Sequence, residues 1–233
     1  MNHREMDNRV RTKLAELFEY KSDQENVQTI IDRGFVAAEF KEGKALFVGI
    51  NPSFTSESKN ESYLYDIDKA ITEYPKHYKN LGDLLLETKY ENDWSYIDLF
   101  QFRETNQNKI DLFFKNDIQF IVEQLRVSHN IISKINPEII IVCNSRAANF
   151  FGINKVVRDG ILDNVWFGYE FIFDERYGID FIKERLSESI IDKNNEILIK
   201  TPVLFTSTLT YMNRFDKRRL NWQLKMIGNR IEE

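Results

Sequence analysis

The chain has 233 residues, of which 42% are hydrophobic and 13% aromatic, which is enough to bury a core and excludes global disorder. Its 32 basic and 37 acidic residues give a formal net charge of −5, so a surface coated in basic charge is excluded but a local basic patch is not. The single cysteine, Cys143, excludes a disulfide within the chain and any zinc or iron–sulfur site built on several cysteines. The charged stretch 1–20 has no signal-peptide pattern and no apolar run could span a bilayer, so we expect a soluble, cytoplasmic protein.

Helical periodicity begins at the N-terminus, where residues 4–20 and 24–32 each place apolar side chains on one face. Gly34 is expected to cap the second of these helices. Asn144 or Ser145 is expected to cap a short helix further along the chain. The later helices are predicted over residues 78–88, 116–135, 145–151, 180–191 and 216–231.

Short apolar runs between these helices predict the strands, which are expected over residues 45–50, 94–100, 138–143 and 202–207. Runs that are apolar at nearly every position are typical of parallel strands buried on both faces. Weaker strand patterns cover residues 169–173 and 196–199. Strands that alternate with helices predict one three-layer α/β domain over 1–233, with a central, mainly parallel four-stranded sheet and helices on both faces. In this interpretation residues 1–40 form N-terminal helices and 154–200 form an insertion.

Polar residues follow the predicted strands, at the sheet edge where open α/β sheets bind ligands. They are Asn51, Asp98, Asn144 with Ser145, and the segment 206–214. Each of these is a weak signal alone, but together they predict a site at the carboxyl ends of the strands.

These motifs resemble the uracil-DNA glycosylase superfamily. Residues 46–53 are similar to the Gly-Ile-Asn-Pro motif of its mismatch-specific uracil/thymine branch, and 137–148 resemble the third strand and following helix. Residues 203–214 look like the final strand and the loop that enters the DNA minor groove. The resemblance runs in order over 45–228, and it implies that a damaged or deaminated base is flipped out of DNA and hydrolysed from its sugar. It implies no cofactor, no metal and no membrane.

By the same resemblance, Asn51 orients the attacking water through its amide oxygen. The neighbouring motif residues would then contact the base, and they are Gly49, Ile50 and Pro52. The residues themselves also fit an Asn-Pro turn that simply ends a strand. The stacking aromatic is expected at Tyr63, with Phe54 and Tyr65 as alternatives. Each of these rings could equally be a packed loop aromatic.

Asp98 stands where the superfamily often has an Asn that reads the base edge. An ionised carboxylate only accepts hydrogen bonds, which favours a base with an exocyclic amine, and Asp98 could instead act as a general base. The purely structural alternatives are that Asp98 caps the following loop or pairs with Arg103.

The last motif departs from the superfamily's His-Pro pair, because residues 208–214 contain neither His nor Pro. The neutral hydroxyl of Thr208 would stabilise a leaving base anion less than a charged group, so efficient uracil excision is not expected. The densest basic cluster follows directly, with Arg214, Lys217, Arg218 and Arg219.

This cluster could contact phosphates while Tyr211 or Met212 forms the wedge, or it could be a solvated helix face. Asn144 and Ser145 are the other predicted nucleic-acid contacts. His77 could reach the pocket as an acid or base, and Cys143 is expected to be an inert core thiol, with a nucleophile as the alternative. Beside the glycosylase, a catalytically silent module for nucleic acid or nucleobases and a small-molecule hydrolase or nucleotide-binding protein stay open.

Overall fold

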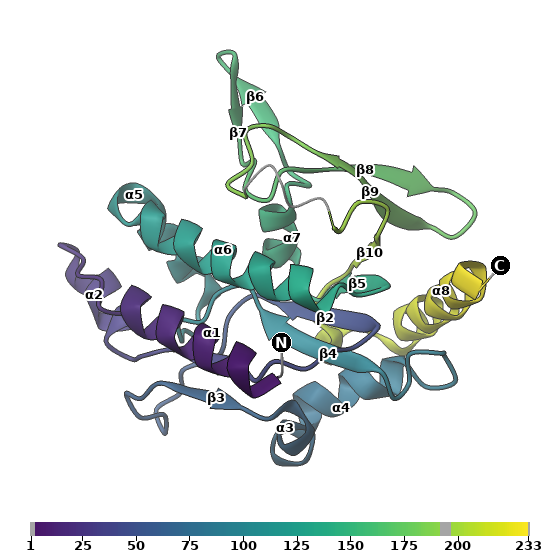
Figure 1. Ribbon diagram of the computed structural model, residues 1–233, viewed down its shortest axis with the longest axis horizontal. Helices are drawn as coiled ribbons and strands as arrows, with labels where there is room; N and C mark the ends of the chain where they lie inside the picture. Colours follow the sequence, from purple (N-terminus) through teal and green to yellow (C-terminus); the bar gives the residue numbers. More distant parts are fainter. Residues whose placement is uncertain (1–2, 192–196, 233) are drawn as a thin grey trace.

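The computed structural model describes residues 3–191 and 197–232, which form helices around one central sheet (Figure 1). The sheet has six strands in the order β4-β2-β5-β10-β9-β8. β4, β2, β5 and β10 run parallel, and β9 and β8 continue the sheet antiparallel. In sequence order the six strands are β2 (Ala45–Gly49), β4 (Trp94–Asp98), β5 (Ile139–Val142), β8 (Tyr169–Asp174), β9 (Ile179–Arg185) and β10 (Pro202–Phe205).

The four parallel strands confirm the four apolar runs of the sequence. Every residue of β2, β4 and β5 is buried, as expected for strands covered on both faces. The register pairs Gly49 with Asp98, and Val48 with both Ile97 and Val142. The carboxyl ends of β2, β4 and β5 are therefore aligned at one edge of the sheet.

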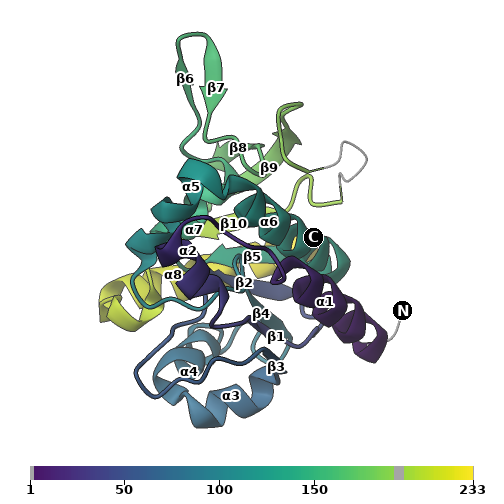
Figure 2. The ribbon, with the colours of Figure 1, turned by 90° about the vertical axis from the view of Figure 1, so that its left-hand side faces the viewer.

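Helices cover both faces of the sheet, which confirms the α/β class with helices on both sides. Figure 2 shows α6 on one side of the sheet and α3 and α4 on the other. The first layer contains α1 (His3–Leu17), α6 (Ile118–Ile135) and α7 (Ser145–Phe151). The second contains α3 (Ile67–Glu73), α4 (Pro75–Leu84) and α8 (Arg214–Glu232).

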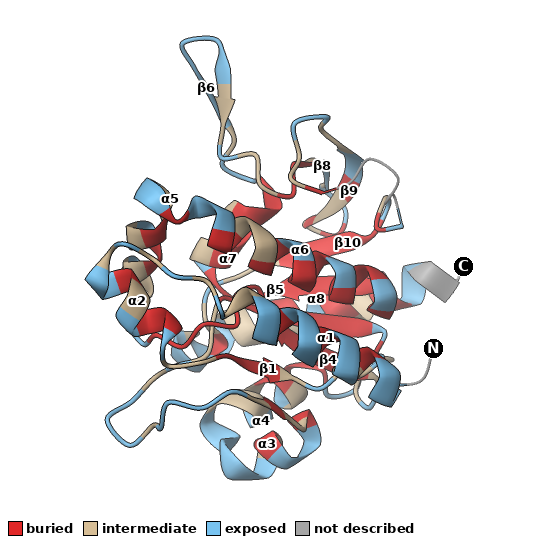
Figure 3. Ribbon diagram, turned by 60° about the vertical axis from the view of Figure 1, so that its left-hand side comes forward, coloured by how far each residue is buried: buried red, intermediate tan, exposed pale blue. Residues whose placement is uncertain are grey.

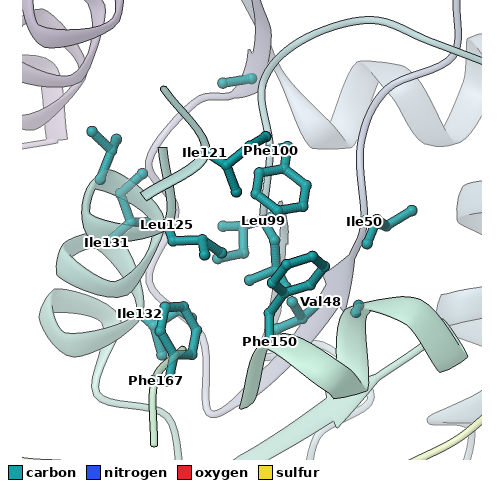
Figure 4. Close-up of a cluster of buried hydrophobic side chains, with 14 of the residues drawn as sticks. Val48, Ile50, Leu99, Phe100, Ile121, Leu125, Ile131, Ile132, Phe150 and Phe167 are labelled. Atoms are coloured by element: carbon teal, nitrogen blue, oxygen red, sulfur yellow. The ribbon is translucent and has the colours of Figure 1, made fainter. Parts of the chain in front are cut away.

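Alternate residues of the strands pack into these two layers. Val48 of β2, with Leu99 and Phe100 that follow β4, meets Leu125 and other side chains of α6 in the cluster of Figure 4. The opposite face of the sheet carries an aromatic set of its own. Its members are Phe47, Trp94 and Tyr96, which pack in the cluster that contains buried residues of α4 and α8.

Smaller elements surround the sheet. α2 (Glu25–Ile31) ends at Asp32, so Gly34, which has φ +76°, follows the cap and is not the cap itself. β1 (Val36–Ala38) and β3 (Tyr63–Tyr65) form a separate parallel pair. The remaining elements are η1 (Gln107–Leu112), α5 (Phe113–Asn116), β6 (Val156–Arg158), β7 (Ile161–Asp163) and η2 (Leu209–Tyr211).

The predicted helix over 180–191 is wrong, because residues Ile179–Arg185 form strand β9. Gly178, with φ +63°, closes a hairpin that pairs β9 with β8, and β10 pairs with its other edge. The predicted strand over 196–199 is also wrong for residues 197–199, which lie in turns, while Glu196 lies outside the described residues. The sheet consequently has six strands instead of four, and two of them come from the segment 154–200.

Residues 156–163 of that segment form the β6–β7 hairpin, which projects from the body of the protein (Figure 2). Figure 3 shows the hairpin largely exposed, while strands β4 and β5 of the central sheet are buried. No helix in residues 3–191 or 197–232 combines the length and apolar character needed to cross a membrane.

Candidate functional site

Gly49 and Asp98 face each other at the carboxyl ends of β2 and β4. A Cβ atom at position 49 would lie less than 3.0 Å from both the Tyr96 hydroxyl and Oδ1 of Asp98. Only glycine leaves room there, so the end of β2 is covered closely by polar side chains from β4. The structure thus brings two of the predicted site residues, Gly49 and Asp98, together.

Asp98 is buried, with 8% of its surface exposed. The Tyr96 hydroxyl donates to its Oδ1 at 2.8 Å. Burial raises the pKa of Asp98 to about 7, although the Tyr96 hydrogen bond acts in the opposite direction. Neither structural alternative for Asp98 is found among the described residues, because Arg103 donates instead to the carbonyl oxygen of Lys59, at 2.6 Å, and no loop N–H bonds the carboxylate.

Three tyrosines surround this carboxyl group, and we call Tyr65, Tyr78 and Tyr96 the tyrosine cluster. Tyr78 donates to the Tyr65 hydroxyl at 2.8 Å, and the rings of Tyr78 and Tyr96 pack edge to face at 5.4 Å. Burial raises the pKa of all three phenols, and the charge of Asp98 acts in the same direction. The hydroxyls are therefore neutral at physiological pH and can donate hydrogen bonds.

His77 lies against this cluster, with its ring 5.7 Å from that of Tyr96 and 4.8 Å from that of Tyr78. Burial lowers the pKa of His77, so its imidazole is neutral at pH 7. The expectation that His77 reaches the strand-end site agrees with this position. As a neutral group, His77 can accept or donate a hydrogen bond but carries no charge to stabilise an anion.

Asn51 follows β2 by two residues, and its side-chain amide is held by the backbone. Nδ2 donates to the carbonyl oxygens of Pro52 at 3.0 Å and of Glu104 at 2.6 Å. Because carbonyl oxygens only accept, these two bonds fix which way the amide faces. Oδ1 is then left buried and has no hydrogen-bond partner in the described part of the chain. A buried acceptor without a partner costs roughly 1–3 kcal/mol, so this atom suits a donor that the protein itself does not supply.

Glu104 supports Asn51 through its own fixed position. Its buried carboxylate binds Arg33 at 2.7 Å and Lys109 at 3.0 Å, while its backbone N–H donates to the carbonyl oxygen of Pro52 at 3.0 Å. Burial would raise the pKa of Glu104, but the N–H of Asn106 and the two cations outweigh it and hold the pKa below its usual value. The loops after β2 and β4 are thereby joined beside Asn51.

The three candidate stacking aromatics have different surroundings. The ring of Phe54 is covered by two guanidinium groups, those of Arg33 at 4.5 Å and Arg103 at 5.0 Å. Tyr63 lies 5.8 Å from the same Arg103. Tyr65 instead belongs to the tyrosine cluster around Asp98, so it is the ring of the three that stands beside the buried carboxyl group.

Asn144 is the N-cap of α7, which decides between the two predicted caps. Its Oδ1 accepts from the N–H groups of Arg146 and Ala147, and its Nδ2 donates to Gln107 at 3.1 Å. Its amide is thus engaged within the protein, whereas Ser145 is exposed.

Cys143 is buried in the second layer, and burial raises the pKa of its thiol far above neutrality, so it stays a thiol and not a nucleophilic thiolate.

The loop after β10 packs against α4 through η2 and leads into α8. Thr208 precedes η2 at its N-cap position and is half-buried. Of the two predicted wedge residues, Met212 packs against the hydrophobic core, whereas 89% of Tyr211 is exposed. Only Tyr211 therefore presents its full side chain to a partner.

The four residues of the predicted basic cluster also differ in how far they are bound within the protein. Lys217 is tied to α4, because its Nζ donates to Oδ1 of Asn80 at 2.9 Å. Arg219 pairs with Asp216 at 3.2 Å. Arg214 and Arg218 are exposed and form no ion pair with any residue that the structure describes. These two arginines are the ones free to meet an anion.

The sequence interpretation missed Tyr96, Tyr78 and Glu104. Tyr96 could have been found, because a residue two positions before Asp98 in a strand lies on the same face. Tyr78 is adjacent to the candidate His77. Nothing local in the sequence indicates Glu104, because its role depends on contacts with Arg33 and Asn51 from distant parts of the chain.

A hollow of about 240 Å³ lies elsewhere, between α1 and α6, and is lined in part by Arg9, Lys13 and Lys134. Within residues 3–191 and 197–232 no three His, Cys, Asp or Glu side chains gather closely enough to hold a metal ion.

No protein-family model matches the chain, and no relative is found among curated proteins. The fold and site therefore define only a class: an α/β protein whose mostly parallel sheet ends in a buried carboxyl group, a tyrosine cluster and a backbone-held asparagine.

Proposed function

We propose that this protein hydrolyses the N-glycosidic bond of a damaged or deaminated base in nucleic acid, with Asn51 positioning the attacking water. The observation that carries the proposal is the buried Oδ1 of Asn51, which has no partner in the described chain while Nδ2 is held by two carbonyl groups. A water that donates one proton to Oδ1 would keep a lone pair free for the sugar carbon. The resemblance of residues 46–53 to the glycosylase motif supports the same role.

The reaction forms a bond between the water oxygen and the anomeric carbon and breaks the bond from that carbon to the base nitrogen. The base leaves with the electron pair, and the water loses a proton. Asp98, with a pKa of about 7, is part ionised near neutral pH, and we assign to it the role of accepting that proton. Its bond to Tyr96 fixes the position of one carboxylate oxygen.

In the alternative role, Asp98 reads the edge of the base instead of accepting the proton, and its hydrogen bonding then differs from that of a permanently ionised carboxylate. A neutral carboxyl group can donate as well as accept a hydrogen bond, as an Asn amide does. Because the pKa is about 7, both forms are populated at neutral pH. We expect bases with carbonyl edges to be favoured below pH 7, and bases with an exocyclic amine above it.

Base stacking, the wedge and the phosphate contacts are assigned by the exposure and position of the side chains. Tyr65, in the tyrosine cluster, is the aromatic ring beside Asp98 on which a flipped base could stack. Exposed Tyr211 is the candidate wedge, and Arg214 and Arg218 are the candidate phosphate contacts.

A base-release assay tests this proposal. The wild-type protein would be incubated with single- and double-stranded oligonucleotides that contain uracil, hypoxanthine, xanthine or mismatched thymine, and abasic sites would be scored by alkaline cleavage. We expect release of at least one of these bases. Failure to release any of them from either form would reject hydrolysis.

A catalytically silent nucleic-acid or nucleobase-binding module is the second candidate function. It is favoured by the neutral state of His77, because the imidazole then brings no positive charge to a leaving base anion. Salt-dependent oligonucleotide binding without base release would identify the module.

A further inference from the structure

The exposed face of α8 carries two large aromatic side chains. Phe215 is 68% exposed and Trp222 is 52% exposed. They are seven residues apart, so they lie on the same face of the helix, about 10 Å apart along its axis. Arg218 lies between them at i+3 and i−4 and is itself exposed. We call Phe215, Arg218 and Trp222 the α8 stripe.

Charge on this helix is opposite to that of the whole chain. α8 contains six basic and two acidic residues, whereas the chain has a formal net charge of −5. Arg218 and the neighbouring Arg214 make no ion pair with any described residue. The stripe and the neighbouring Arg214 thus combine flat aromatic surface with two guanidinium groups that are free to bind an anion.

The helix that carries the stripe is fixed firmly to the rest of the protein, and Figure 1 shows it beside α4. Asn221 donates to the carbonyl oxygens of Leu84 and Leu86, and Lys217 donates to Asn80. On the side of the β8–β9 hairpin, Gln223 donates to the carbonyl oxygen of Gly178 at 2.7 Å. The exposed rings are therefore presented on a rigid support, which reduces the entropy that is lost when a ligand binds.

We propose that the α8 stripe binds single-stranded nucleic acid, with unpaired bases stacked on Phe215 and Trp222 and phosphates bound by Arg218 and Arg214. Aromatic rings with arginines between them match the alternation of bases and phosphates along one strand. Bases in a duplex are stacked on each other and cannot offer their faces, so the stripe favours an unpaired strand. An apolar protein partner would instead leave the guanidinium of Arg218 desolvated and unpaired.

This inference rests on the proposed nucleic-acid function and deepens it, because it names the form of the substrate and adds Phe215 and Trp222. It does not depend on base hydrolysis at Asn51. Binding and base release are separate measurements, so either proposal can fail while the other stands.

The test is fluorescence anisotropy with a labelled 20-mer oligothymidylate and with a duplex of the same length, using the whole protein. We expect tighter binding of the single strand and quenching of tryptophan fluorescence. Trp222→Ala should weaken single-strand binding roughly 5- to 150-fold, the range expected for one lost base stack, and Trp222→Tyr should restore most of it. Phe173→Ala is the matched control, because Phe173 lies on β8 and is 58% exposed, and it should bind as the wild type does.

Several results would overturn the inference. They are no binding of the single strand, equal binding of strand and duplex, or single-strand affinity that Trp222→Ala leaves unchanged. Binding to anionic phospholipid vesicles with no binding of the oligonucleotide would also overturn it and would assign the stripe to a membrane surface. Urea unfolding of Trp222→Ala should match the wild type, which would show that lost affinity is not lost folding.

Discussion

The Tyr96 hydroxyl donates a 2.8 Å hydrogen bond to Asp98, and both groups occupy the space where a side chain at position 49 would stand. The strand pairing of Gly49 with Asp98 creates this relationship, because it places the end of β2 directly beside the β4 side chains. The close packing around Gly49 and the burial of Asp98, a candidate catalytic residue, therefore depend on each other.

Gly49→Ala should disrupt this arrangement. The new methyl group would force Tyr96 or Asp98 to move, at a cost of about 1–3 kcal/mol in the free energy of unfolding. Gly82→Ala is the control, because Gly82 lies in α4 and its Cβ would meet only Trp94, at 3.8 Å. That change should be neutral or stabilising. Equal stability of both variants in urea unfolding would show that the close contact at position 49 is absent.

Asp98→Asn should change how stability depends on pH. The pKa of Asp98 is about 7 in the folded protein against 3.8 for an ordinary Asp carboxyl group, so between these values only the folded state keeps the proton. Stability from this group is therefore greatest at acid pH and falls as pH rises to about 7. The variant lacks this loss, so its stability relative to wild type should rise by on the order of a few kcal/mol from pH 4 to pH 8. Urea unfolding at several pH values measures it, and a constant difference would contradict the raised pKa.

His129 should show the opposite pH dependence. Burial, with a smaller effect of Arg185, lowers its pKa from 6.5 to about 3, and its Nε2 lies 2.6 Å from the Tyr169 hydroxyl. The folded state disfavours the protonated ring, so this contribution is complete above pH 6.5 and is lost as pH falls towards 3. His129→Gln should be less stable than wild type at pH 8 but should lose less stability on acidification.

The effects of Asp98 and His129 oppose each other between about pH 4 and 6.5. The free energy of unfolding of the wild type should therefore change less with pH in this range than that of either variant. If His129→Gln and wild type lost stability in parallel on acidification, the imidazole would not be the buried neutral group described above.

Much of the parallel sheet could be predicted from its sequence, because residues 45–50 and 138–143 are apolar at almost every position and are buried as such runs require. The segment 180–191 was misread because its apolar residues fit a helix about as well as a strand. Its pairing depends on β8 and β10, which periodicity does not reveal, although Gly178 was an available turn signal.

The candidate site was predictable only where it follows strand ends. Asn51 and Asp98 are predicted in this way, because their polar character at the end of an apolar run is a local signal. The unpartnered state of Asn51 Oδ1 was not predictable, because it arises from the carbonyl group of Glu104, which is 53 residues away in sequence.

Glu104→Gln should destabilise the loop that holds Asn51. It would leave the Arg33 guanidinium without its buried counter-charge, at a cost of roughly 3–5 kcal/mol at pH 7. Because the pKa of Glu104 is lowered in the folded protein, this contribution is present at neutral pH and is lost as pH falls through that pKa.

Lys109→Ala removes the other, more exposed cation, whose side chain is 43% exposed, and should cost less than about 1 kcal/mol. Thermal or urea unfolding of both variants at pH 7 checks the order of the two effects. A larger loss for Lys109→Ala would contradict the assignment of Arg33 as the main partner of Glu104.

The most direct test of the central claim is the single-turnover rate of base release by wild type, Asn51→Ala and Asn60→Ala, on oligonucleotides carrying uracil, hypoxanthine or xanthine. Asn60 lies in the same loop region but is exposed, so it is the matched control. The account predicts release by wild type and Asn60→Ala, and a rate about 100-fold or more lower for Asn51→Ala, because the water loses its position. Release at the wild-type rate by Asn51→Ala would contradict the role assigned to its buried amide oxygen.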